Sequence, residues 1–190
     1  MPEEQPSSKI TKFLILFAVM VAITKSLSNA GYFEPKDHKG KGYYVKIPAG
    51  WVKARLPKNM QYPKDVEMVM FVPQGTNLSK GQPDMFISIY SKKLPTPIWI
   101  EDEFPDILAA IQKEGMEIKD KGQIKIDELI THWVVYLDKA VPALVLEFYM
   151  VTDNNTFHKI QYSAPPSKFN EHRRSFEELK DSFKFKFSLY

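Results

Sequence analysis

The stretch GYYVKIPAGW, residues 42–51, has the pattern of a short strand that ends in a turn and runs directly into a tryptophan. Residues 43–47 have the strand pattern. Pro48 lacks the N–H that another rung of a sheet needs, and Gly50 lets the backbone turn. We therefore expect Trp51 to re-enter the core, where burial of its ring stabilises the fold by about 3 kcal/mol. The alternative is an exposed aromatic docking site.

Strand patterns recur along the rest of the chain, and two helix patterns interrupt them. The strands are expected at residues 43–47, 51–55, 67–72, 85–91, 117–126, 129–137, 144–151 and 156–164. A first helix is expected over 101–114, because apolar side chains recur there at helical spacing: Phe104, Ile107, Leu108 and Ile111. This order predicts an α+β fold, in which an antiparallel β-sheet is flanked by helices.

Short sequence motifs predict the position of one hairpin and the start of a second helix. Asn154 and Asn155 tolerate positive φ, so they predict a tight hairpin before the last of these strands. A second helix is expected after Pro165-Pro166, with Ser167 as its N-cap, and it extends to about Phe183.

Length, composition and net charge exclude several classes of protein and of functional site. With 190 residues, 44% of them hydrophobic, the chain is long enough for one globular domain with a substantial core. The chain has no cysteine, which excludes disulfides, thiolate metal sites and cysteine nucleophiles. Its formal net charge is only +3, and nucleic-acid binding usually needs a strongly basic face. We therefore expect no nucleic-acid partner.

The charges are distributed unevenly along the chain. Residues 31–64 hold eight basic side chains and two acids, whereas residues 65–190 hold 15 basic and 19 acidic ones. The lysines within residues 31–64 can protect a sheet edge against aggregation. They can also form a docking surface for anionic lipid or an acidic partner protein, and each base near a membrane then adds about 1 kcal/mol. On that second interpretation the partner-binding residues are Lys36, Lys39, Lys41, Lys46, Lys53, Arg55 and Lys58.

The N-terminus carries an uninterrupted apolar run at residues 13–23, with lysines on both sides. Its length suits the core of a secretory signal peptide, and the small residues of Ser28-Asn29-Ala30 would allow cleavage after Ala30. A helix over residues 10–27 would also reach about 27 Å, enough for a retained membrane anchor.

These alternatives divide the chain into three parts. Residues 1–30 are a signal peptide or a membrane anchor, residues 31–41 a linker, and residues 42–190 the globular domain. In either case we expect the domain to be exported, to the periplasm or the extracytoplasmic face of the membrane.

Common catalytic motifs are missing from the sequence: GxSxG, HExxH, GxxxxGK[ST] and GxGxxG. His132 and His158 lie on expected strands, either as two polar strand residues or as a pair of metal ligands. Four acids open the helix expected over 101–114: Glu101, Asp102, Glu103 and Asp106. They can serve the helix dipole alone, or they can bind a divalent cation such as calcium or manganese. We expect no other cofactor.

Several of these stretches together carry a family resemblance. They are GYYVKIPAGW, Val69-Met70-Phe71-Val72, Ile87-Ser88-Ile89, the hairpin of Leu146-Glu147-Phe148-Tyr149 with Lys159-Ile160-Gln161-Tyr162, and the closing Ser182-Phe183-Lys184-Phe185. Their order resembles the PsbP-like family, which is named after an extrinsic subunit of photosystem II and includes a Ran-GTPase-binding branch. The resemblance implies an α-β-α sandwich that assists a larger assembly without catalysis. It carries no metal or partner site over to single residues.

Three hypotheses about function follow. The first is a non-enzymatic, exported accessory subunit, held at the membrane, that docks on a larger membrane-associated protein complex through the basic segment. The alternative is a module of the cell envelope that binds a small molecule or a divalent metal. A third is a hydrolase assembled from dispersed Ser, His and Asp residues, which requires a histidine hydrogen-bonded to a serine or an aspartate in a pocket.

Overall fold

The computed structural model describes residues 36–55, 62–78 and 83–186. The expected signal peptide or anchor, and Lys58 of the basic segment, lie outside these residues. The elements in the described part of the chain are β1 (Lys36–Gly40), β2 (Tyr43–Ile47), β3 (Trp51–Lys53), β4 (Val66–Pro73), β5 (Phe86–Lys93), α2 (Ile100–Lys113), β6 (Glu117–Ile126), β7 (Leu129–Asp138), β8 (Ala143–Val151), β9 (Thr156–Ala164), α3 (Phe169–Asp181) and β10 (Lys184–Phe185).

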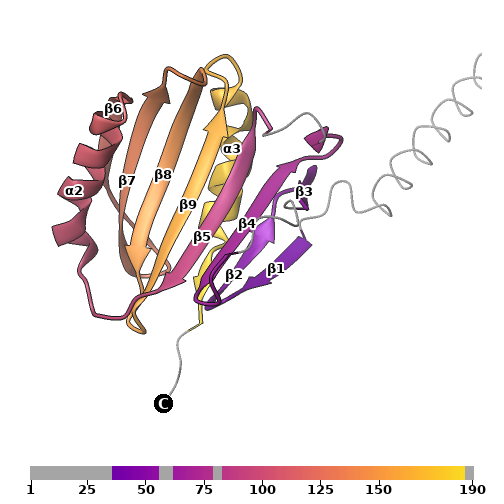
Figure 1. Ribbon diagram of the computed structural model, residues 1–190. Helices are drawn as coiled ribbons and strands as arrows, with labels where there is room; N and C mark the ends of the chain where they lie inside the picture. The colour runs from indigo at the N-terminus through magenta and orange to yellow at the C-terminus, as the bar shows by residue number, and fades with distance from the viewer. Residues whose placement is uncertain (1–35, 56–61, 79–82, 187–190) are drawn as a thin grey trace, which may run out of the picture.

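The strands form two antiparallel sheets. The larger sheet has seven strands in the order β3-β4-β5-β9-β8-β7-β6, and the smaller has three in the order β1-β2-β10. The late strands β6 to β9 form a meander, in which each strand pairs with the next, whereas β5 pairs with β9 far along the chain. The fold is therefore α+β, and the helices cover the sheet as expected (Figure 1).

The larger sheet has an apolar core on each face. On one face α2 packs through Ile100, Phe104 and Ile111 against side chains of β7 and β8. On the other face α3 and the small sheet pack together, and their buried apolar residues in this core are Tyr43, Val45, Ile47, Phe169, Phe176, Leu179 and Phe185. Successive residues of β8 alternate between these two cores, as the period of a strand requires.

The opening stretch folds as its sequence predicts. Strand β2 ends at Ile47, Gly50 has a φ of 77°, and the Trp51 N–H donates to the Pro48 carbonyl at 3.1 Å. Trp51 then lies in the core that α3 covers, with 5% of its surface exposed. The core prediction is therefore confirmed, and the alternative of an exposed aromatic at this position is wrong.

Two boundaries differ from expectation. Residues 36–40, expected in the linker, form β1, so the folded part begins earlier than residue 42. Helix α3 has Lys168 rather than Ser167 at its N-cap, because Pro165 and Pro166 start a turn that the Lys168 N–H closes on the Pro165 carbonyl at 2.9 Å. Asn155, with a φ of 61°, makes the expected hairpin between β8 and β9.

Candidate docking surface

The outer face of the small sheet combines lysines with an exposed tyrosine. Alternation along β2 buries Tyr43 and Val45 and points Tyr44 and Lys46 outward. Pairing then sets Lys39 of β1 and Lys184 of β10 on either side of Tyr44. We call this surface the basic face and define it as Lys39, Tyr44, Lys46, Lys184 and Lys186.

Two ammonium groups hold the Tyr44 ring. The Lys186 Nζ lies 4.2 Å from the ring centroid and the Lys39 Nζ lies 5.6 Å from it, both within the range of cation–π attraction. Lys186 also donates to the Gly40 carbonyl at 3.1 Å, which fixes its position. Tyr44 remains 42% exposed, so this prearranged aromatic ring is available to a partner.

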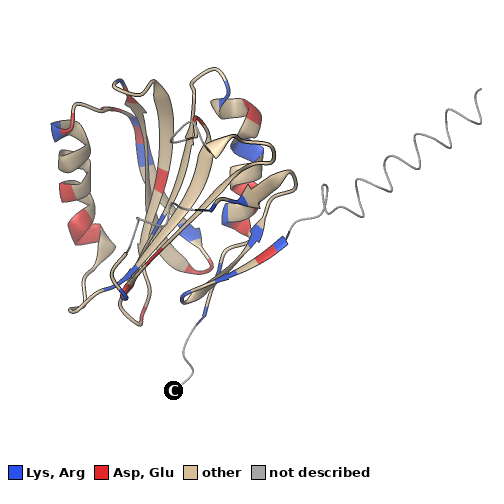
Figure 2. Cartoon of the chain, turned by 45° about the vertical axis from the view of Figure 1, so that its right-hand side comes forward, with Lys and Arg blue, Asp and Glu red and all other residues tan. Residues whose placement is uncertain are grey.

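Positive charge dominates this sheet. Residues 36–47 and 184–186 include six lysines and one acid, Asp37. Two of the lysines are tied to neighbouring elements: Lys184 pairs with Asp127 at 2.7 Å, and Lys41 donates to the Lys64 carbonyl at 2.8 Å. In Figure 2 the blue segments of the β1–β2 hairpin lie on the opposite side of the view from the red segments at the start of α2.

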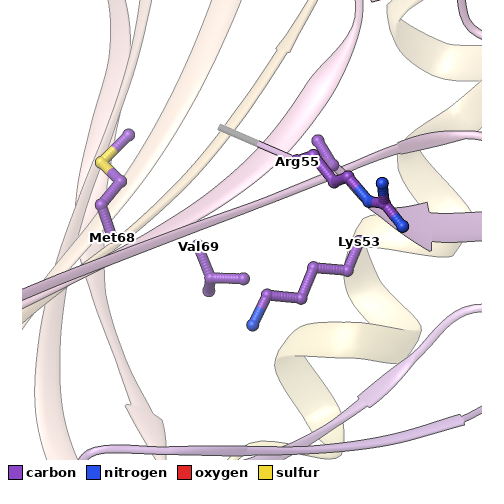
Figure 3. Close-up of a pocket in the computed structure, with 5 residues that line it drawn as sticks. Lys53, Arg55, Met68 and Val69 are labelled. Carbon is purple, nitrogen blue, oxygen red and sulfur yellow. The ribbon is translucent and has the colours of Figure 1, made fainter. Parts of the chain in front are cut away.

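The structure divides the predicted basic residues into two groups. Lys36, Lys39, Lys41 and Lys46 lie exposed on the small sheet, whereas Lys53 and Arg55 lie at the end of β3. The second pair lines an open pocket of about 570 Å³, together with Ala54, Met68 and Val69. Figure 3 shows the Lys53 side chain reaching toward Val69, while Arg55 points away from it.

Sequence reasoning missed Tyr44, Lys184 and Lys186. Tyr44 belongs to the opening stretch, where only Trp51 was considered as a docking residue. The other two are far away in sequence, within a region of net negative charge, and join the surface only through pairing of β10 with β2. The signal that could have found them is the alternation of Lys184-Phe185-Lys186, in which Phe185 is 6% exposed.

The acids expected to bind a metal are dispersed over the first turns of α2. Glu101, Asp102, Glu103 and Asp106 are all exposed, and the first three lie where the helix dipole favours negative charge. Across residues 36–55, 62–78 and 83–186, no three His, Asp or Glu side chains gather in a group that could hold a metal ion.

The two strand histidines lie on opposite faces of the large sheet. His132 packs against Phe104 of α2, with ring centroids 4.7 Å apart, whereas His158 packs against Tyr43 and Phe183 on the other face. Strand β8 separates them, and the register sets His132 opposite Tyr149 but His158 opposite Met150. The hypothesis of a metal pair is therefore wrong.

One histidine does meet a serine. The Nδ1 of His158 lies 2.8 Å from the Ser91 hydroxyl, but His158 is fully buried and Ser91 is 2% exposed. Burial lowers the pKa of His158 to about 4, so its ring is neutral at pH 7. Neither residue lines the pocket at Lys53 or a second pocket that is lined by Trp99, so this pair gives the hydrolase hypothesis no accessible site.

No protein-family model matches the chain, and no curated protein matches it in sequence. Solved structures do match it. The solution structure of cyanobacterial PsbP (CyanoP) from Synechocystis sp. PCC 6803 aligns over 82% of this chain and 95% of its own, with a TM-score of 0.56 and 13% identity. The chain has a PsbP-like fold.

Two further structures share the PsbP-like architecture at low identity. LpqN of Mycobacterium tuberculosis, described as involved in cell envelope biogenesis, aligns over 80% of this chain and 89% of its own, with a TM-score of 0.60 and 10% identity. A Pseudomonas aeruginosa protein of unknown function aligns over 81% of this chain and 99% of its own, with a TM-score of 0.53 and 8% identity. At these identities the PsbP-like likeness describes the fold alone.

Proposed function

We propose that this protein is an exported, non-enzymatic accessory subunit that docks on a larger membrane-associated complex through its basic face. The observation that carries the proposal is Tyr44, an exposed ring held between two ammonium groups on a sheet with six lysines and one acid. Tyrosine with surrounding cations is typical of interface anchors, because the ring buries a large area at little cost in side-chain entropy. The partner is an acidic protein surface.

Two observations agree with a non-enzymatic role. The Ser91–His158 pair is buried in the core, and the acids of α2 are dispersed over the helix surface. The names of two proteins with the same fold support an extracytoplasmic setting, since one is a cyanobacterial PsbP and the other is described as involved in cell envelope biogenesis.

The test is purification of the full-length chain from native membranes at low and at high salt. A double variant, Lys39→Glu with Lys186→Glu, reverses both charges that lie at the Tyr44 ring. The matched control, Lys121→Glu with Lys125→Glu, changes two exposed lysines of β6 that lie outside the basic face. We expect the unaltered chain and the control to recover one stable partner in low salt, and the basic-face variant to lose it.

A finer pair of variants separates the ring from the charges. Tyr44→Phe keeps the ring face and should retain the partner, whereas Tyr44→Ala should weaken binding about tenfold or more, as at other aromatic anchors. Recovery of the chain only as a free monomer, or equal recovery with both double variants, would contradict the proposal.

A second candidate function is the binding of a small anionic molecule at the pocket beside β3. Lys53 and Arg55 supply charge there, and Val69 and Met68 supply apolar contact in a volume of about 570 Å³. The hypothesis that the acids of α2 bind a divalent metal also stays a prediction. Calorimetry separates the two hypotheses. Lys53→Ala should abolish the heat of binding of an organic anion, and Glu103→Ala should abolish the heat of binding of calcium or manganese.

A further inference from the structure

A groove runs along one end of the large sheet, where three connections meet. The segment between β5 and α2, the turn between β6 and β7, and the hairpin between β8 and β9 enclose about 430 Å³. The lining residues with a large apolar side chain include Trp99, Ile130 and Val151. None of the sequence motifs pointed to this groove, because its walls come from segments far apart in the chain.

Two side chains expose much apolar surface in this groove. Trp99 is 74% exposed and Ile130 is 41% exposed, and both are among the large hydrophobic residues that the described surface leaves uncovered. The Trp99 backbone has a structural role, since its carbonyl accepts from the N–H groups of Asp102 and Glu103 at the start of α2. That role does not require an indole side chain, so the exposed ring is free to contact a partner.

The walls of the groove are acidic. Glu101, Glu128 and Asp153 line it, and its lining includes no lysine or arginine. The basic side chain that reaches this hairpin, Lys93, donates to the Asn154 carbonyl. The exposed apolar surface is therefore surrounded by carboxylates, which complement an occupant with positive charge.

Backbone and side-chain hydrogen bonds hold the walls in place. Asn154 accepts from the hydroxyls of Thr152 and Thr156 at 2.7 and 2.8 Å. The Leu94 N–H donates to the Asn155 carbonyl at 2.8 Å, which ties the segment before α2 to the hairpin. Because these walls are already held in place, little conformational entropy is lost when a partner binds.

We propose that this groove binds an apolar segment of a partner protein that is flanked by lysine or arginine. Its apolar side chains pack against the indole of Trp99 and against Ile130, and its flanking bases pair with the carboxylates of Glu101, Glu128 and Asp153. The charge of the groove is opposite to that of the basic face, so the two surfaces select different chemistry. This interface does not depend on the function proposed above.

The test uses the full-length chain in nanodiscs of zwitterionic lipid, with empty nanodiscs as the blank. The probe is a short fluorescent peptide with a Leu-Phe centre and lysines at both ends, compared with a peptide of the same centre ended by glutamates. We expect saturable binding of the lysine peptide alone, seen in fluorescence anisotropy. Trp99→Ala should weaken binding by about tenfold or more, and higher salt should weaken it further.

Matched variants separate the groove from the general surface. Val141→Ala removes another exposed hydrophobic residue, outside the groove, and should leave binding unchanged. Glu128→Lys should weaken binding, whereas Glu114→Lys, at the far end of α2, should not. Equal binding of both peptides, no binding of the lysine peptide, or full affinity in Trp99→Ala would overturn the proposal. Self-association that Trp99→Ala abolishes would also overturn it, because the occupant would then be a second copy.

Discussion

Tyr43 and Tyr44 are neighbours in sequence but serve opposite roles, because side chains alternate across a strand. Tyr43 is fully buried and stacks on Phe183 with centroids 4.9 Å apart. Burial, with a contribution from Glu67, raises the pKa of Tyr43, so its phenol stays neutral. Tyr44 faces outward between its two lysines. One dipeptide therefore joins the candidate docking surface to the core.

His158 makes the stability of the fold depend on pH. Burial lowers its pKa from 6.5 to about 4, so between these values the unfolded chain binds more protons than the folded one. The contribution of neutral His158 to the free energy of unfolding is therefore fully present above pH 6.5 and is lost as the pH drops toward 4. We expect a loss of about 3 kcal/mol over this range from His158, and burial lowers the pKa of His38 in the same direction.

Urea denaturation followed by tryptophan fluorescence at pH 7, 5.5 and 4 measures this dependence. The variant His158→Gln should show a shallower slope between pH 6.5 and 4 than the unaltered chain. Parallel pH profiles for His158→Gln and the unaltered chain would show that another group titrates.

Glu147 places a buried charge in the core under α2. It is 3% exposed, accepts a hydrogen bond from the hydroxyl of Tyr149, and forms an ion pair with the Lys159 ammonium at 2.9 Å. Lys159→Met would leave this carboxylate buried without its cation, and we expect a loss of about 2 to 3 kcal/mol at pH 7. Lys121→Met, on the exposed face of β6, should change stability by less than about 0.5 kcal/mol in the same denaturation experiment. Equal stability of the two variants would mean that water replaces the ammonium.

At the scale of elements, the strands with an apolar face could be predicted from the sequence. The strands that form mainly because a neighbouring strand offers backbone hydrogen bonds could not. The strand patterns at residues 43–47, 85–91 and 156–164 predicted β2, β5 and β9 to within a few residues. Strand β1 reads Lys36-Asp37-His38-Lys39-Gly40 and has no apolar side chain, so it looks like a linker until β2 offers its backbone groups. Strand β10 is two residues long, so the only alternation that marks it is the short run from Lys184 to Lys186.

The same limit explains what was missed in the candidate surface. Lysines were predicted where they cluster in sequence, and Lys39 and Lys46 are indeed exposed on the small sheet. Lys184 joins them only through a pairing between residues 140 positions apart, 184 and 44. The groove at Trp99 likewise depends on three connections that meet in space, which composition and periodicity cannot indicate.

Gly40 shows that β1 is nevertheless fitted to its neighbour. A Cβ at this position would lie 2.1 Å from the ring of Tyr43, whose side chain is fully buried. Gly40→Ala should therefore destabilise the fold by about 1 to 3 kcal/mol, since the ring has little room to shift. Lys39→Ala, at the preceding exposed position, should cost less than about 0.5 kcal/mol. Thermal unfolding of both variants checks this, and unchanged stability of Gly40→Ala would mean that β1 is not packed on Tyr43.

At the scale of the whole molecule, two surfaces of opposite charge adjoin at the turn between β6 and β7. Asp127 in this turn pairs with Lys184 at 2.7 Å and accepts the Phe185 N–H at 2.7 Å, while the next residue, Glu128, lines the groove. Asp127 thus joins the small sheet to the large one and neutralises one lysine at the boundary. The basic face and the acidic groove remain distinct beyond it.

We expect these two surfaces to act independently, because Tyr44 and Trp99 lie on separate elements and the residues that line the groove include none of the basic face. Tyr44→Ala should weaken partner recovery and leave binding of the lysine peptide unchanged, and Trp99→Ala should do the reverse. In the double variant the two losses should add, with a coupling free energy below about 0.5 kcal/mol. A Trp99→Ala chain that also loses the membrane partner would instead mean that one partner spans both surfaces, so that the protein presents a single continuous interface across the β6–β7 turn.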